Sequence, residues 1–195
     1  MASFAPHFCD DPLAPPITET CVLGCRWLVR VIDRDVNRNG DQYGCGALED
    51  IARGLPLRAL RMYRANDVLT HPPDELSPEE HAALTVGLIE GAWVKADRVV
   101  FATAHLWHSV TRLHRGLLAL ERRSRGHLIA GTRISLVLRA RTHPQEPRQV
   151  VAVPAVLSVD LVTRPGCRDT GFVRSLAPGE ELATVNPEEE EPVWA

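Results

Sequence analysis

The stretch His127–Ala140, HLIAGTRISLVLRA, decides the fold and raises the main question about function. Residues 134–138 contain an apolar run of aliphatic side chains around one serine, which predicts a buried strand. That serine, Ser135, has no turn residue beside it. A buried hydroxyl that lacks a hydrogen-bond partner costs about 1–3 kcal/mol. Ser135 therefore either bonds a neighbouring backbone carbonyl, as a structural serine does, or is a nucleophile whose base comes from elsewhere in the chain.

The composition is that of an ordinary globular domain. The chain has 195 residues, of which 45% are hydrophobic and 24% are charged, so it is long enough to bury a sizeable single core. The net charge of −3 gives no reason to expect nucleic acid or an anionic membrane as a partner. No apolar run is long enough to span a membrane, and the N-terminus lacks the basic and apolar regions of a signal peptide.

Cysteine usage predicts a reducing, cytoplasmic compartment. Five cysteines at irregular spacing are an odd number, which argues against a disulfide framework. Cys21 and Cys25 stand four apart, but no second Cys/His pair at zinc spacing follows closely. We therefore expect neither a metal ion nor another cofactor.

Periodicity along the chain predicts a mostly β (α+β) domain with one main helix. The main helix is expected over residues 109–123, with His114 solvated among arginines. Shorter helices are expected over residues 46–54 and after Ser77, whose Ser-Pro-Glu-Glu order suits a helix start. Pro154 should break the last apolar run or place it at a sheet edge. Strands are expected over residues 21–32, 57–63, 86–94, 98–106, 134–138 and 150–162.

The ends of the chain differ in composition from the middle. Residues 1–16 contain four prolines and are expected to form a flexible N-terminal arm. Residues 17–176 are the predicted domain. Residues 177–195 carry the like-charge run Glu188–Glu191 and are expected to be an acidic, disordered tail.

A serine nucleophile needs a base, and histidine is suited to that role near neutral pH. Of the eight histidines, His71 stands out because Pro72 and Pro73 hold it in a rigid, extended segment. The alternative reading of His71 is an ordinary loop residue. His105 and His108 could instead serve a metal-dependent hydrolase, but they lack acidic ligands at suitable spacing.

Four motifs resemble those of the prohead proteases of tailed phages. Asn37–Tyr43 resembles the N-x-N-G-R-x-Y stretch of that family, and Asp67–Pro72 resembles its G-E-x-x-H-P segment. Ala130–Ser135 resembles the V-G-x-S strand, and Ser158–Pro165 resembles the closing x-x-x-D-x-V-x-x-P-A motif. The motifs stand in the family's order, and the resemblance spans about residues 20–175.

The resemblance implies a small β-barrel flanked by helices, of the herpesvirus-assemblin type, with a nucleophile in mid-strand. It implies that Ser135 is the nucleophile and His71 the general base. Asp160 is the candidate for orienting the histidine, against the alternative of a strand-end residue that caps a turn; Asp67 and Asp97 are the next candidates. Arg164 and Arg168 are candidates for stabilising the oxyanion.

The resemblance also implies a serine endopeptidase of capsid maturation, which cleaves scaffold and major capsid proteins inside the procapsid in the host cytoplasm. Self-cleavage and a homo-oligomer are further expectations. The alternative is a non-catalytic structural or scaffolding β-barrel protein of the phage head. The presence of both Ser135 and His71 favours the protease, because a non-catalytic barrel has no use for the pair.

Overall fold

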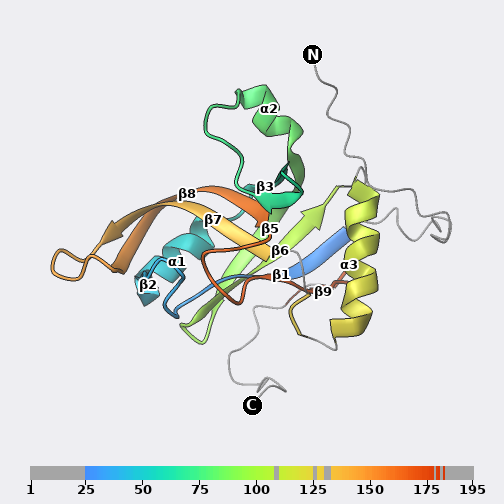
Figure 1. The fold of residues 1–195 in the computed structure, drawn as a ribbon. Coiled ribbons are helices and arrows are strands. Elements are labelled where there is room, and N and C mark those ends of the chain that lie inside the picture. The colour runs from blue at the N-terminus through green and yellow to red at the C-terminus, as the bar shows by residue number, and fades with distance from the viewer. Residues whose placement is uncertain are drawn as a thin grey trace.

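Strands predominate in the computed structural model, which describes residues 25–107, 110–124, 127–129, 133–177, 179–180 and 182 (Figure 1). The predicted arm over residues 1–16, most of the predicted tail and His108 lie outside these residues. The elements are β1 (Cys25–Asp33), β2 (Gln42–Tyr43), α1 (Cys45–Gly54), β3 (Ala59–Ala65), β4 (Val68–Thr70), α2 (Pro78–Ala83), β5 (Thr85–Lys95), β6 (Val99–Leu106), α3 (Thr111–Ser124), β7 (Arg133–Thr142), β8 (Gln149–Val162) and β9 (Gly171–Ser175).

The strands form one mixed sheet in the order β2-β8-β3-β5-β6-β1-β9, with β4 paired to β3 and β7 paired to β8. Most neighbours are antiparallel, but β8 runs parallel to both β2 and β3. The predicted mostly β class is therefore confirmed. Of the two alternatives predicted for Pro154, the break does not occur, because β8 continues through this residue. The edge position fits, because β2 and β3 pair with β8 only at residues 149–150 and 159–161. Pro154 lies where the register with β7 shifts, a position in which a missing donor is tolerated.

The sheet is open, and the closed barrel expected from the sequence is not shown. No strand ladder among the described residues joins β7 to β9. Their ends approach one another through side chains instead, because the Thr170 hydroxyl donates to the carbonyl of Ile134 and the Arg133 guanidinium donates to the carbonyl of Thr170. The backbone of Ile129 bonds part of the edge of β9, because its N–H donates to the Phe172 carbonyl.

Helix α1 covers β8 because its sequence is amphipathic. Its apolar residues recur every three or four positions, and Ala47, Leu48, Ile51 and Ala52 are buried. The helix also approaches β8 closely, since a Cβ atom at Gly54 would lie 3.1 Å from Val156 Cγ2. This packing fixes the strand that carries Asp160.

Helix α3 confirms the predicted main helix, but the prediction for His114 is wrong. His114 is buried, and its Nδ1 accepts a hydrogen bond of 3.2 Å from the indole N–H of Trp27. The fully buried indole needs an acceptor, and this requirement outweighs the cost of burying the imidazole. His114 therefore attaches α3 to β1.

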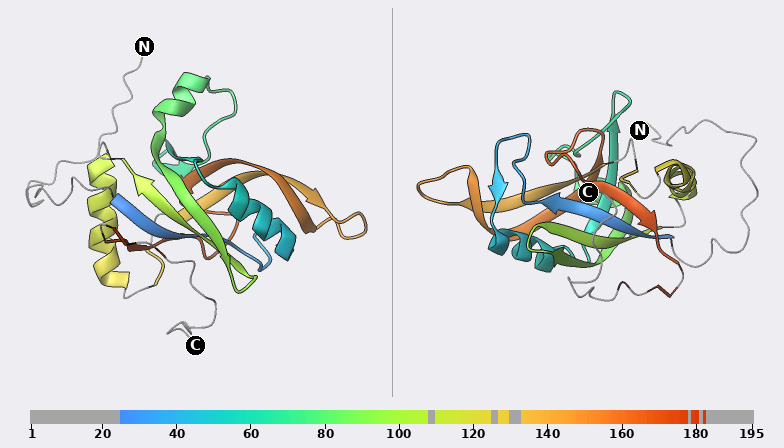
Figure 2. Two further views of the ribbon diagram at one scale, coloured as in Figure 1. Left: turned by 180° about the vertical axis from the view of Figure 1, so that it is seen from behind. Right: turned by 90° about the horizontal axis from the view of Figure 1, so that it is seen from below.

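Helix α2 and the β7–β8 hairpin extend away from the rest of the domain. Figure 2 shows the hairpin at the end of the molecule opposite α3. Helix α2 has no buried residue and stands above the sheet in Figure 1. The predicted N-terminus of α2 is confirmed, because Ser77 and Glu80 form a reciprocal capping box. No helix in the described part of the chain is long and apolar enough to cross a bilayer.

Candidate functional site

Ser135 lies opposite an acid on the neighbouring strand. It is the third residue of β7, and the antiparallel register pairs it with Asp160 of β8. Directly opposed residues point to the same face of a sheet at about 5 Å. Both side chains therefore rise from one face, with Ser135 9% exposed and Asp160 fully buried.

His71 reaches this face from the segment that follows β4. Strands β3 and β4 form a hairpin whose two turn residues, Asn66 and Asp67, have positive φ angles, as a two-residue turn of this type requires. The end of β4 is also bonded to the end of β8, where the N–H of Thr163 donates to the Leu69 carbonyl over 2.9 Å. These bonds bring His71 beside β8, and Pro72 then restricts its backbone.

The three side chains form a continuous chain of hydrogen bonds. His71 Nδ1 lies 2.6 Å from Asp160 Oδ2, and His71 Nε2 lies 3.1 Å from Ser135 Oγ. An ionised carboxylate can only accept, so Nδ1 carries the proton and Nε2 presents a lone pair to the serine hydroxyl. This is the tautomer that a general base requires. The histidine side chain is 41% exposed, so a reacting group can approach it.

Several donors surround the Asp160 carboxylate. The Arg61 guanidinium donates from Nε to Oδ1 over 2.8 Å and from Nη2 to Oδ2 over 3.2 Å. The Ser158 hydroxyl donates to Oδ2 over 3.0 Å. Burial alone would raise the pKa of Asp160, but the hydrogen bonds from His71, Arg61 and Ser158 and the charge of Arg61 outweigh it and hold that pKa below its usual value. Asp160 is therefore an anion at neutral pH.

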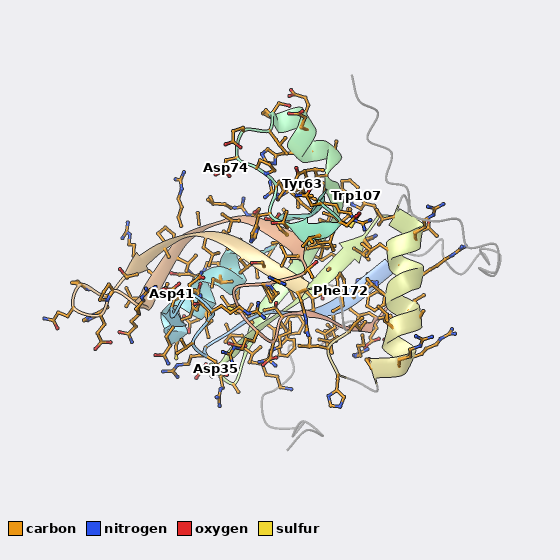
Figure 3. All side chains as sticks on the ribbon, in the orientation of Figure 1. Asp35, Asp41, Tyr63, Asp74, Trp107 and Phe172 are labelled. Carbon is orange, nitrogen blue, oxygen red and sulfur yellow. The ribbon has the colours of Figure 1, made fainter. Side chains whose placement is uncertain are left out.

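A cavity of about 340 Å³ opens beside Ser135 and His71. One wall is the loop that carries the Asn37–Tyr43 motif. Asn37 Oδ1 accepts from the backbone N–H groups of Asn39 and Asp41 over 2.9 and 2.8 Å, so the motif forms a braced turn. Asp41, labelled in Figure 3, lies on this loop close to β2.

The loop after β8 also lines the cavity. It is bonded to the Asn37 turn, since the Arg38 N–H donates to the Gly166 carbonyl over 2.8 Å. Arg164 is exposed and lines the cavity together with Ser135. Arg168 is also exposed but is not among the residues that line the cavity. Of the two oxyanion candidates, Arg164 is therefore the better placed.

Two other groups in the cavity wall are unsuited to nucleophilic chemistry. Burial raises the pKa of the Cys167 thiol to about 12, so the reactive thiolate is scarce at neutral pH. Burial also raises the pKa of Tyr43 to about 12. Among the described residues that line the cavity, only Ser135 has a hydroxyl or thiol that is hydrogen-bonded to a histidine.

The remaining candidates lie elsewhere. The side chain of Asp67 is 92% exposed and pairs with Arg64, and Asp97 belongs to the β5–β6 turn. His105 bonds Glu90 on the neighbouring strand at 2.9 Å. Nowhere in the described ranges do three or more His, Cys, Asp or Glu side chains gather as a metal site would need. Cys45 and Cys167 are free thiols, whereas Cys9 and Cys21 lie outside the described residues.

Sequence reasoning missed Arg61 of β3 and Ser158 of β8, which contact the acid, and His81 of α2, which contacts Arg61. Ser158 could have been found, because it stands two positions before Asp160 and so shares its face of the strand. Arg61 could not, because its place depends on the parallel pairing of β3 with β8. The chain has 22 basic residues, of which Lys95 is the only lysine, so nothing in the sequence distinguishes this arginine.

Comparison with known proteins gives no assignment: no family model, no curated protein and no solved structure matches this chain.

Proposed function

We propose that this chain is a serine endopeptidase of the prohead-protease type, with an open relative of the assemblin barrel as its fold. The observation that carries the proposal is the hydrogen-bonded chain from Ser135 through His71 to Asp160. The motif resemblance points to capsid and scaffold proteins as the substrates. It also places the reaction inside the assembling procapsid.

The chemistry follows from the geometry. His71 Nε2 takes the proton of the Ser135 hydroxyl while Oγ attacks the scissile carbonyl, and the imidazolium that forms is stabilised by the buried Asp160 anion. The C–N bond then breaks as His71 returns the proton to the leaving amine. Water repeats the sequence on the acyl-enzyme and releases Ser135. Arg164, on the cavity wall, is the proposed partner of the oxyanion.

The alternative, a structural barrel without turnover, is less well supported. A structural serine would be satisfied by one backbone bond, and a structural histidine would be buried. Here the histidine is partly exposed at a cavity and its Nε2 atom lies 3.1 Å from the serine hydroxyl. The acid behind it is anionic and fully buried, which is costly for stability alone.

A reaction that needs no knowledge of the substrate tests this proposal. A fluorophosphonate reacts with an activated serine, so we expect the wild-type chain to be labelled at Ser135. Ser135→Ala and His71→Ala should abolish labelling while circular dichroism shows the same fold. Ser175→Ala is the matched control, because its hydroxyl bonds Glu121 of α3 and Ser175 is not among the residues that line the cavity. Labelling of the wild type no faster than that of Ser135→Ala would reject the proposal.

Self-processing provides a second readout. We expect the wild-type chain to lose part of its C-terminal segment during prolonged incubation, because an acidic, proline-rich segment is easily accommodated as an extended substrate. Intact-mass measurement should then show a shortened wild type beside a full-length Ser135→Ala variant. Equal masses in both would exclude self-cleavage, and co-expression with the capsid and scaffold proteins would then show whether cleavage occurs in trans.

A further inference from the structure

Arg61 occupies a special position behind the acid. It lies on β3 in register with Asp160 of the parallel strand β8, and its side chain is 16% exposed. Its Nε and Nη2 atoms each donate to a different carboxylate oxygen, at 2.8 and 3.2 Å. A two-point contact of this kind fixes the rotation of the carboxylate as well as its position.

The third nitrogen of the same guanidinium bonds a histidine of α2. Arg61 Nη1 lies 2.9 Å from Nδ1 of His81. A guanidinium has donors only, so Nδ1 of His81 must accept and carry no proton. All three guanidinium nitrogens are thus used, two on Asp160 and one on His81. The orientation of the fork therefore depends on α2.

Helix α2 lies outside the hydrophobic core. None of its residues is buried, so it contributes little apolar burial. The capping box of Ser77 and Glu80 nevertheless stabilises the start of this short helix. The residue that follows it, Leu84, accepts from the backbone N–H of Met62, next to Arg61 on β3. These bonds hold His81 over Arg61.

The position of Asp160 Oδ2 matters for the proposed chemistry. His71 Nδ1 lies 2.6 Å from that oxygen, and a short rotation of the carboxylate would lengthen the bond and turn the imidazole away from Ser135. Ser158 also donates to Oδ2, but a single hydroxyl leaves the carboxylate free to turn. Arg61 is the group that restrains both oxygens at once.

We propose that Arg61 is a positioning residue, which aims the Asp160 carboxylate at His71, and that His81 of α2 holds the guanidinium in the orientation this requires. The inference rests on the proposed function for its effect on turnover, but the arrangement of charges can be tested without it. Arg61 and His81 do not contact the reacting atoms. They act through Asp160 and His71.

The test compares substitutions of Arg61 with a matched control on the same strand. Arg61→Gln removes the charge and the fork, and Arg61→Lys keeps the charge but cannot fork. Arg64→Gln removes an exposed arginine that pairs with Asp67. We expect the maximal rate of fluorophosphonate labelling to fall about 10- to 100-fold in both Arg61 variants, as for other outer-shell partners. The half-saturating probe concentration and the Arg64→Gln variant should stay close to wild type.

The Asp160 carboxyl supplies a readout that does not depend on activity. Its ¹³C resonance, assigned by its loss in Asp160→Asn, should titrate at higher pH in Arg61→Gln than in wild type. In Arg61→Lys it should stay nearer to wild type, because the charge remains. If the titration moves but no variant or wild type is labelled, the proposed function fails and the placement of Arg61 stands. An unchanged titration in Arg61→Gln overturns the inference.

Two variants of α2 test the part played by His81 and serve if Arg61→Gln does not fold. His81→Asn offers an amide oxygen near the place of Nδ1, whereas His81→Ala offers no acceptor. We expect labelling by His81→Asn to remain near wild type and labelling by His81→Ala to slow several-fold, with both variants folded because the residue is not in the core. Labelling of His81→Ala at the wild-type rate would show that α2 does not hold Arg61.

Discussion

Replacing Asp160 by asparagine tests the site most severely, because the substitution keeps the shape of the side chain and removes its charge. In the wild type the two carboxylate oxygens accept from Arg61, His71 and Ser158. In the variant one of these oxygens becomes an amide group that can only donate. At least one donor then faces another donor, and the Arg61 charge loses its buried counterion.

Both effects have a magnitude that follows from these contacts. Breaking a buried ion pair costs about 3–5 kcal/mol, which is a large part of the roughly 5–15 kcal/mol that holds a typical domain together. The variant should therefore fold, but with a clearly lower free energy of unfolding. The proposed turnover should fall by about 10²- to 10⁴-fold, because the amide favours the wrong tautomer of His71.

The loss of stability should also depend on pH in a defined direction. The pKa of Asp160 is lowered in the folded chain, so its ion pair contributes stability above the usual carboxyl value of about 4, and that contribution is lost as the pH falls through the lower folded value. The gap between wild type and Asp160→Asn should accordingly be full at pH 7 and narrow toward acid pH.

Urea unfolding followed by tryptophan fluorescence, at pH 7 and at several acid pH values, measures this gap, and fluorophosphonate labelling measures the reactivity of Ser135. Asp67→Asn is the control, since Asp67 is 92% exposed and lies in a turn that asparagine also adopts readily. Wild-type labelling by Asp160→Asn would place the orienting group elsewhere. A gap that widens toward acid pH would show that Asp160 is not held as an anion.

Two further predictions concern the framework around the site. A Cβ atom at Gly87 would lie 2.2 Å from the backbone oxygen of His105, so Gly87→Ala should lower the free energy of unfolding by at least about 1–3 kcal/mol. Gly91 lies on the same strand, and a Cβ atom there would have nothing within 4 Å, so Gly91→Ala should change the free energy of unfolding far less. Equal losses in the two variants would contradict the close packing at Gly87. Burial lowers the pKa of His114, so this imidazole binds a proton at higher pH in the unfolded chain than in the folded one. The free energy of unfolding of the wild type should therefore decline as the pH falls below about 6.5. His114→Asn, which keeps an acceptor but does not titrate, should show a shallower decline, and an identical pH profile would contradict this reading.

The sequence was most informative where side-chain patterns are local. Helix α3 and the start of α2 at Ser77 were both predicted from short stretches. Asn66 and Asp67, in the turn between β3 and β4, are residue types that adopt positive φ angles readily, so this hairpin also has a local signal. Strands β2 and β4 have only two and three residues, too few for any periodicity to appear.

The site residues show the same difference between local patterns and features that depend on the assembled sheet. The motif resemblance named Ser135, His71 and Asp160, and the structure brings these three side chains together. The resemblance could not name Arg61, because the parallel pairing of β3 with β8 depends on how the whole sheet assembles. The burial of His114 was missed because helical periodicity placed this polar residue beside Leu117 without showing that an indole across the interface needed an acceptor.

The arrangement explains how the proposed nucleophile can lie within a strand. The ladders set Ser135, Asp160 and Arg61 in one row across β7, β8 and β3, and neighbouring strands are about 4.8 Å apart. A slip of one residue in either ladder would turn one member of the row to the opposite face. The sheet thus fixes the proposed nucleophile, the acid and the arginine by backbone hydrogen bonds. Only His71 must be placed by a loop, and it is the one member of the set that is followed directly by two prolines.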